Sequence, residues 1–113
     1  MSRVKGLKSI MFNLSIITPD GKVFDDQVEA VVAPGAEGSF GILKNHIPIV
    51  SLLQKGILKL TQNGNENFYC LDSGVLEFSQ NNCTLVVDQA IQSADKEEAK
   101  KNLKNLIEQS DQK

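Results

Sequence analysis

The fold is decided by the stretch Ile57-Leu58-Lys59-Leu60-Thr61-Gln62-Asn63-Gly64-Asn65-Glu66-Asn67-Phe68-Tyr69-Cys70-Leu71-Asp72. Two runs with strand character flank the Asn63-Gly64 pair, and an Asn-Gly pair in that setting is the strongest short-range signal for a β-hairpin. We therefore predict two antiparallel strands, residues 57–61 and 66–72, joined by a tight turn.

Similar short runs lie on both sides of this hairpin. They combine apolar alternation or β-branched residues with turn residues at their ends, which is typical of strands. The predicted strands cover residues 11–17, 22–25, 28–33, 47–50, 75–79 and 83–87. Short strands at this frequency predict a mainly β fold, a two-sheet antiparallel β-sandwich.

The periodicity changes near the C-terminus. From Asp95 onward, Ala99, Leu103, Leu106 and Ile107 recur at helical spacing among charged and amide residues. This pattern predicts a short amphipathic helix whose apolar stripe rests on the β body or on a partner. Asp95 and Glu98 have the spacing of a capping box, and Glu97 and Lys101 have the spacing of an i,i+4 ion pair.

The chain has 113 residues and is long enough for one domain with a core of its own. We expect an N-terminal extension without fixed structure over residues 1–10, a β-sandwich domain over 11–92 and a helical element over 93–113. Apolar runs are too short for a membrane span or a signal peptide, so we expect a soluble globular protein. The two cysteines, Cys70 and Cys83, lack the spacing of metal ligands, and we expect reduced thiols that pack as small hydrophobes.

Charge is distributed unevenly along the chain. Residues 11–94 carry four lysines against nine carboxylates, whereas residues 1–10 carry three basic side chains. An acidic body has no basic stripe to neutralise phosphates, so we expect no nucleic-acid partner.

A glycine-rich segment over residues 34–48 interrupts the strand pattern, and we expect one long loop there. Pro34, Gly35, Gly41 and Pro48 are the residues expected to shape it. It lacks the Gly-Lys-Ser/Thr ending of a phosphate-binding loop and a helix after its last glycine, which excludes a phosphate cradle.

We interpret this loop as a protein-contact surface. Phe40 is its expected apolar anchor, and Glu37, Gly38, Ser39 and His46 complete the contact set. The alternative is a loop that only closes the end of the sandwich.

Catalysis has little support in the residues. His46 is the only histidine and has no evident nucleophile beside it, and we expect neither a catalytic residue nor a metal site nor a cofactor. Asp25 and Asp26 are adjacent in a strand, so their side chains point to opposite faces rather than forming a carboxylate pair.

The order of motifs resembles the epsilon subunit of the F-type ATP synthase. The resemblance lies in Pro34-Gly35-x-x-Gly38-x-x-Gly41-Ile42-Leu43-x-x-His46-x-Pro48, preceded by residues 17–24 and followed by Lys55-Gly56-Ile57-Leu58-Lys59. It continues through Ser73-Gly74-Val75-Leu76-Glu77-Phe78 and Thr84-Leu85-Val86-Val87-Asp88, and covers residues 12–108.

This resemblance implies a non-catalytic subunit of the central stalk, which couples the gamma subunit to the membrane c ring during proton-driven ATP synthesis. Glu37 to Phe40 would meet the c ring, and strands on one face of the sandwich would meet gamma. The C-terminal helix is a further candidate contact, to the alpha/beta hexamer. Association with the membrane would be peripheral, through the complex, at the cytoplasmic face of the bacterial inner membrane rather than at the plastid thylakoid.

The chain departs from the family pattern at two places. The family often has a carboxylate where this chain has Ser39, so only Glu37 could replace that charge. An ATP-sensing motif of some members aligns with residues 94–99, where Asp95 and Ala99 are retained and Glu98 stands in place of an arginine. A carboxylate repels phosphates, so we expect no ATP binding. We also expect that the residues after Gln92 are too few for the second C-terminal helix of many bacterial members, and so no inhibition by helix insertion.

Two other functions remain as alternatives. A stand-alone β-sandwich that binds a small ligand should have a concave, aromatic-lined pocket. A hydrolase that uses His46 should lose turnover on His46→Ala.

Overall fold

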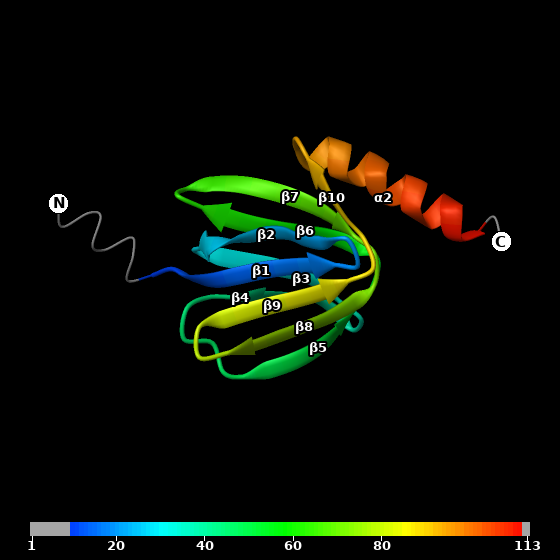
Figure 1. The fold of residues 1–113 in the computed structure, drawn as a ribbon. Helices are drawn as coiled ribbons and strands as arrows, with labels where there is room; N and C mark the ends of the chain where they lie inside the picture. Colours follow the sequence, from blue (N-terminus) through cyan, green and yellow to red (C-terminus); the bar gives the residue numbers. More distant parts are fainter. Residues whose placement is uncertain (1–9, 112–113) are drawn as a thin grey trace.

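The computed structural model describes residues 10–111 and folds them into a β-sandwich followed by one helix (Figure 1). The predicted N-terminal extension therefore lies, apart from residue 10, outside the described residues. The predicted fold class, a β-sandwich with a short C-terminal helix, is confirmed. In chain order the elements are β1 (Phe12–Thr18), β2 (Gly21–Val28), β3 (Ala30–Gly35), β4 (Gly38–Ile42), β5 (Ile49–Leu53), β6 (Gly56–Gln62), β7 (Asn65–Leu71), β8 (Gly74–Ser79), β9 (Asn82–Val87), β10 (Ala90–Ser93) and α2 (Lys96–Asp111).

The strands form two layers that meet at one edge. One layer has the order β10-β7-β6-β3, with β4 on the other side of β3, and the second has the order β5-β8-β9-β1-β2. The layers are connected where Gly35 of β3 pairs with Leu53 of β5. Neighbouring strands are antiparallel except β1 and β9, which run parallel.

The central hairpin forms as predicted. β6 and β7 pair from Gly56↔Leu71 to Gln62↔Asn65, which leaves Asn63 and Gly64 as a two-residue turn. Both turn residues have positive φ, 53° at Asn63 and 81° at Gly64. This is the backbone of a type I′ turn, whose twist matches that of the strands it joins.

The core lies between the two layers and follows the strand alternation. In β1, Phe12, Leu14 and Ile16 are buried while the residues between them are not. The Phe12 ring meets Phe78 of β8 edge to face, with centroids 5.5 Å apart. The expected free thiols are confirmed as well: Cys70 and Cys83 are both free and buried. Burial raises the pKa of Cys70 to about 11 and that of Cys83 to about 12.

The prediction of one long loop over residues 34–48 was wrong. Pro34 and Gly35 end β3, Gly41 lies inside β4, and only the segment from Leu43 to Pro48 connects strands without regular structure. The two strands form a hairpin in which Val31 pairs with Ile42 and Gly35 with Gly38. The glycines of β4 hid its alternation, because a residue without a side chain contributes nothing to an apolar pattern.

β10 was also missed by the sequence analysis. It has four residues and pairs antiparallel with β7 from Ala90↔Leu71 to Ser93↔Phe68. A strand this short carries too few positions for alternation to be recognised.

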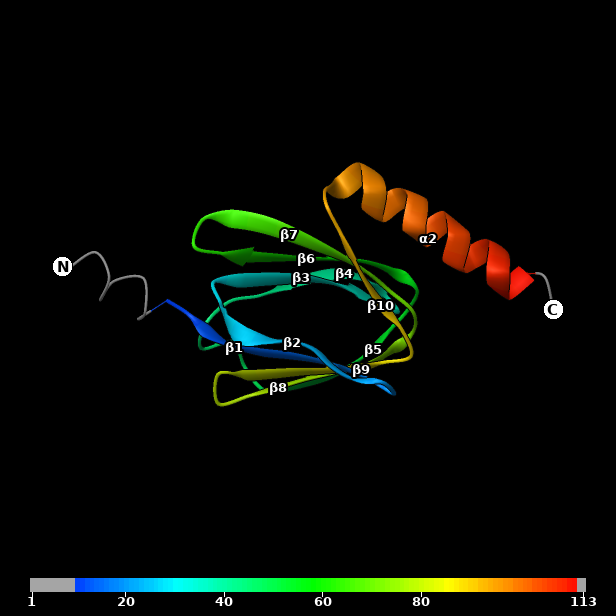
Figure 2. The same cartoon turned by 45° about the horizontal axis from the view of Figure 1, so that its top comes forward.

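Helix α2 lies over β7 and β10 on the outside of one layer (Figures 1 and 2). Ala99 and Leu106 are buried as predicted, whereas Ile107, expected in the same stripe, is 44% exposed. A polar contact takes part in the docking: Asn102 Nδ2 donates to Ser93 Oγ at 2.9 Å. The predicted ion pair between Glu97 and Lys101 is replaced by one with Lys100, whose Nζ lies 4.0 Å from Glu97 Oε2.

Gly74 offers a direct test of the packing between β8 and β9. A Cβ at this position would collide with the Val86 carbonyl oxygen and lie 2.7 Å from Val87 Cα, both backbone atoms that cannot turn away. Gly74→Ala should therefore lower the free energy of unfolding by about 2 kcal/mol, as overpacking does elsewhere. Urea denaturation followed by circular dichroism measures this change.

Gly41→Ala is the matched control, since a Cβ there meets only the Val31 carbonyl oxygen at an ordinary 3.8 Å. Its free energy of unfolding should stay within about 0.5 kcal/mol of the unsubstituted chain. Equal effects of the two substitutions would contradict the register of β8 and β9.

Candidate functional site

The tip of the β3–β4 hairpin, Ala36 to Gly38, is the first part of the candidate site. Gly38 has φ 128°, a backbone conformation that favours glycine, and it lets β4 turn back onto β3. Two hydrogen bonds hold the tip against β5: Ala36 N donates to the Leu52 carbonyl oxygen at 2.9 Å, and Gln54 N donates to that of Pro34 at 3.0 Å. The tip is therefore a fixed feature of the surface.

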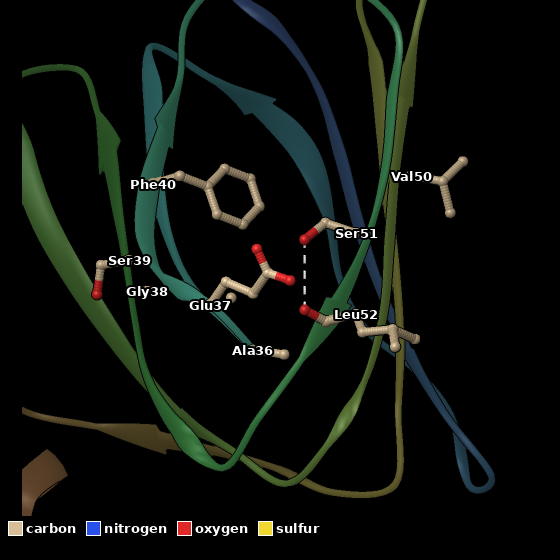
Figure 3. Close-up of a pocket in the computed structure, with 9 residues that line it drawn as sticks. Ala36, Glu37, Gly38, Ser39, Phe40, Val50, Ser51 and Leu52 are labelled. Carbon is tan, nitrogen blue, oxygen red and sulfur yellow. Dashed lines mark hydrogen bonds between the residues drawn. The ribbon is translucent and has the colours of Figure 1, made fainter.

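A groove of about 490 Å³ lies between this tip and β5. Figure 3 shows the Glu37 carboxylate pointing into the space between the Phe40 ring and Ser51. The expected anchor Phe40 is half-buried and packs against the core, so it forms the inner wall of the groove and does not project from the surface. With one aromatic side chain, this groove is not the aromatic-lined pocket that a stand-alone ligand-binding module should have.

Ser39 faces a different place from Glu37. Ser39 lines the edge of the first groove, but its side chain points away from Phe40 in Figure 3. It also lines a second groove, whose walls include Lys59, Glu66 and Lys96. In that groove Lys59 Nζ lies 3.3 Å from Glu66 Oε2. The Glu37 and Ser39 side chains therefore point in different directions, and replacement of the charge missing at position 39 by Glu37 stays a prediction.

His46 lies at the opposite end of β4 from Glu37, across a strand of five residues. Its Nδ1 is 2.7 Å from the Ile47 carbonyl oxygen and must carry the proton, because a carbonyl can only accept. Its ring packs edge to face on Phe78, with centroids 5.8 Å apart. The predicted contact residues are therefore divided between two ends of the sandwich.

The segment around His46, from Leu43 to Pro48, is held in place by the β8–β9 turn. Asn45 N donates to Asn81 Oδ1 at 2.7 Å, and Asn81 Nδ2 donates to Asn45 Oδ1 at 3.0 Å. Leu43 and Ile47 are more than half exposed on this fixed segment. Two apolar side chains are thus presented to solvent next to His46.

A row of four apolar side chains, three exposed and one half-buried at Ile17, crosses the outer face of the second layer. Leu52 pairs with Val75, Val75 with Val86, and Val86 with Ile17, so four strands each contribute one side chain to the row. Leu52 is 66% and Val86 54% exposed. Sequence analysis missed this row because the four positions come together only through the strand register.

The N-terminus of α2 contains the positions aligned with the ATP-sensing motif. Asp95 Oδ1 accepts a hydrogen bond from Glu98 N at 2.9 Å, and Glu98 Oε1 accepts one from Ala94 N at 3.2 Å. The predicted capping box is present, except that Glu98 accepts its hydrogen bond from the backbone N of Ala94 instead of Asp95. Ala99 is buried against the sandwich. These carboxylates occupy the helix end that an anion would need, although the absence of ATP binding itself stays a prediction.

Asp25 and Asp26 have separate partners, as their neighbouring strand positions predict. Lys22 Nζ and Ser15 Oγ donate to Asp25 and lower the pKa of its carboxyl group. Gln62 Nε2 donates to Asp26 at 3.0 Å. The two carboxylates therefore do not form a joint site.

Residues 10–111 contain neither a cluster of metal-ligand side chains nor a membrane-spanning helix. No group of three or more His, Cys, Asp or Glu side chains in this range could hold a metal ion. None of the helices in the same range has the length and apolar character needed to span a bilayer.

A family profile and individual relatives both relate this chain to ATP synthase epsilon chains. The profile of the family described as "ATP synthase, Delta/Epsilon chain, beta-sandwich domain" matches residues 11–93. The ATP synthase epsilon chain of a Sulfurovum species is 34% identical in an alignment over 106 residues, and the match covers 89% of this chain and 83% of that protein. The epsilon chain of Campylobacter curvus is 35% identical over 99 residues, covering 87% of this chain and 75% of the relative.

Solved structures share the fold at lower identity. A chain in the Euglena gracilis mitochondrial ATP synthase structure superposes with a TM-score of 0.70 at 22% identity, over 84% of this chain and 62% of that chain. A chain in the Tetrahymena thermophila mitochondrial ATP synthase central stalk and c-ring structure gives 0.60 at 17% identity, over 74% and 71% of the two chains.

Proposed function

The chain belongs to the ATP synthase delta/epsilon family, and from this premise we propose that it is the epsilon subunit of an F-type ATP synthase. In that role it is a stalk subunit rather than the catalytic one, and it couples the gamma subunit to the membrane c ring. The observation that carries the proposal is the family match over the whole β-sandwich, together with two exposed surfaces that suit protein partners.

The apolar row Ile17, Val86, Val75 and Leu52 is the proposed gamma-binding face. Helix α2 covers the outside of the other layer, so this sheet face is the one left open for a large partner (Figure 2). Exposed apolar side chains in register form a flat, rigid patch, and burying such a patch supplies most of the free energy of a stable interface. Leu43 and Ile47 extend the available apolar surface beyond one end of β5.

The hairpin tip is the proposed c-ring contact. It lies at the end of the sandwich where the β1–β2, β5–β6, β7–β8 and β9–β10 connections also lie (Figure 1). These connections carry Asp20, Asp72 and Asp88, and the one lysine among them, Lys55, is paired with Asp72 at 3.2 Å. An acidic end with Glu37 at its tip suits a basic partner surface, which electrostatic attraction would orient. Association with a membrane would then be indirect, through the c ring.

Co-purification with the complex tests both the function and the face. A tagged chain expressed in its host should recover gamma and the c ring from detergent-solubilised membranes. Leu52→Asp and Val86→Asp should each reduce the recovered gamma about thirtyfold, because a charge at the centre of an apolar interface costs about 2 kcal/mol. Quantitative immunoblotting of gamma measures the loss.

Ile107→Asp provides the control, since it places the same charge on a partly exposed apolar side chain of α2, away from the apolar row. It should leave gamma recovery unchanged, and circular dichroism should show all three variants folded. Gamma recovery by Leu52→Asp and Val86→Asp at the level of the unsubstituted chain would reject the face. Purification of gamma and the c ring without this chain would reject the function.

Substitutions at the hairpin tip test the c-ring contact. Glu37→Gln removes the only carboxylate of the tip and should weaken binding to the c ring by roughly twofold to fivefold, as expected for an exposed charge pair. Weaker binding should appear as a deficit in proton pumping by membrane vesicles during ATP hydrolysis, which measures coupling. The deficit should shrink at about 1 M salt, where exposed charges are screened.

Ser39→Ala is the companion variant, because it alters the same hairpin without removing a charge and its side chain points away from Phe40. Its effect on coupling should be smaller than that of Glu37→Gln. An equal or larger effect would move the proposed contact from Glu37 to the Ser39 side of β4.

A further inference from the structure

The Asn63-Gly64 turn joins β6 to β7 at the end of the sandwich opposite the hairpin tip. Both residues are exposed, and both have positive φ. Asparagine followed by glycine is the sequence in which the asparagine side chain is most easily attacked by the next backbone nitrogen, because glycine has no side chain to block the approach. The turn therefore contains the reactants for spontaneous deamidation.

The nitrogen that would attack is held by a carboxylate. Gly64 N donates a hydrogen bond to Glu29 Oε1 at 2.8 Å. Glu29 lies between β2 and β3, and its own backbone N donates to the Thr61 carbonyl oxygen at 2.7 Å. The carboxylate is thus anchored beside the turn by the backbone of the neighbouring strand.

The reaction requires Gly64 N to lose the proton that this hydrogen bond retains. Hydroxide takes this proton, and the deprotonated nitrogen forms a bond to Asn63 Cγ. The bond from Cγ to Nδ2 breaks, the amide nitrogen takes a proton from water and leaves as ammonia, and a succinimide ring results. Water opens either carbonyl of the ring and gives aspartate or isoaspartate. A negative carboxylate next to the nitrogen opposes its deprotonation, and the hydrogen bond resists its movement towards Cγ.

We propose that Asn63 is a deamidation site whose rate is set by Glu29. While the hydrogen bond is intact, the turn is protected. Loss of the bond, by local opening of the hairpin end or by substitution, exposes the reactive nitrogen.

The other asparagines with positive φ show why Asn63 is the susceptible position. The carboxamides of Asn45 and Asn81 are hydrogen-bonded to each other across two loops. Their following residues, His46 and Asn82, both carry side chains that hinder attack by the backbone nitrogen. Asn63 is the one followed by glycine.

The modification would change the hairpin. Aspartate adds a negative charge close to Glu29, and isoaspartate adds a backbone atom to a turn that has room for two residues. Either product disturbs the Gln62↔Asn65 pair, and with it the Gln62 contacts to Asp26 and to the Gln27 carbonyl oxygen. The connection between the two layers at this end would loosen.

Peptide mapping by mass spectrometry, with an isoaspartate-specific methyltransferase assay, tests the proposal on the full chain kept at mildly alkaline pH and physiological temperature. Glu29→Gln retains an oxygen acceptor without the charge, and Glu29→Ala removes both. Deamidation at Asn63 should accelerate in both variants. Glu29→Ala should be the faster, by roughly threefold to tenfold over the unsubstituted chain, the effect expected from losing one typical hydrogen bond.

Glu66→Gln is the matched control, because it removes a carboxylate of the same hairpin that contacts Lys59 and not Gly64. Its deamidation rate at Asn63 should equal that of the unsubstituted chain, and thermal unfolding should show all variants folded during incubation. Equal rates in all four chains, no modification at Asn63 in any of them, or the same acceleration by Glu66→Gln would each overturn the proposal.

Discussion

The contact between β3 and β5 at Gly35 is the constraint on which the candidate site depends. Gly35 pairs with Leu53, and the bonds from Ala36 N and Gln54 N connect the two strands on either side of it. A side chain at Gly35 would collide with the Phe40 ring, 2.8 Å from its Cε1, and with the Gly38 carbonyl oxygen. Glycine at this position therefore lets Gly38 and the Phe40 ring pack closely against β3 at the point where β3 pairs with β5, beside the groove that contains Glu37.

The two outer faces of the sandwich differ because of α2. The helix covers β7 and β10 with Ala99 and Leu106, while the apolar row from Ile17 to Leu52 on the other layer stays exposed. A free sandwich with both faces open would expose more apolar surface than a stable monomer usually does. The helix thus covers one face and leaves the other open, and this open face is the one proposed to bind gamma.

Local chemistry made much of the fold predictable. Asn63-Gly64 fixed the central hairpin, and the alternation in residues 11–17 identified β1 and its buried side chains. β4 was missed because Gly38 and Gly41 contribute no side chains to its alternation. Ile107 was expected to be buried because it lies four residues after Leu103, but it is exposed. Helical spacing alone does not show how far the sheet extends beneath the helix. The Leu52 to Ile17 row could not be predicted, since its four residues are neighbours only through pairings between distant segments. The same limit applies to Glu37 and Ser39, which lie two positions apart in the sequence but whose side chains point in different directions.

Proton-driven ATP synthesis by vesicles of host membranes lacking this chain is the most direct test of the proposed coupling role. Synthesis should be low in such vesicles and should recover when the purified chain is added back, because the proposed coupling requires this subunit to hold gamma and the c ring together. Vesicles that synthesise ATP at the full rate without the chain would contradict the account.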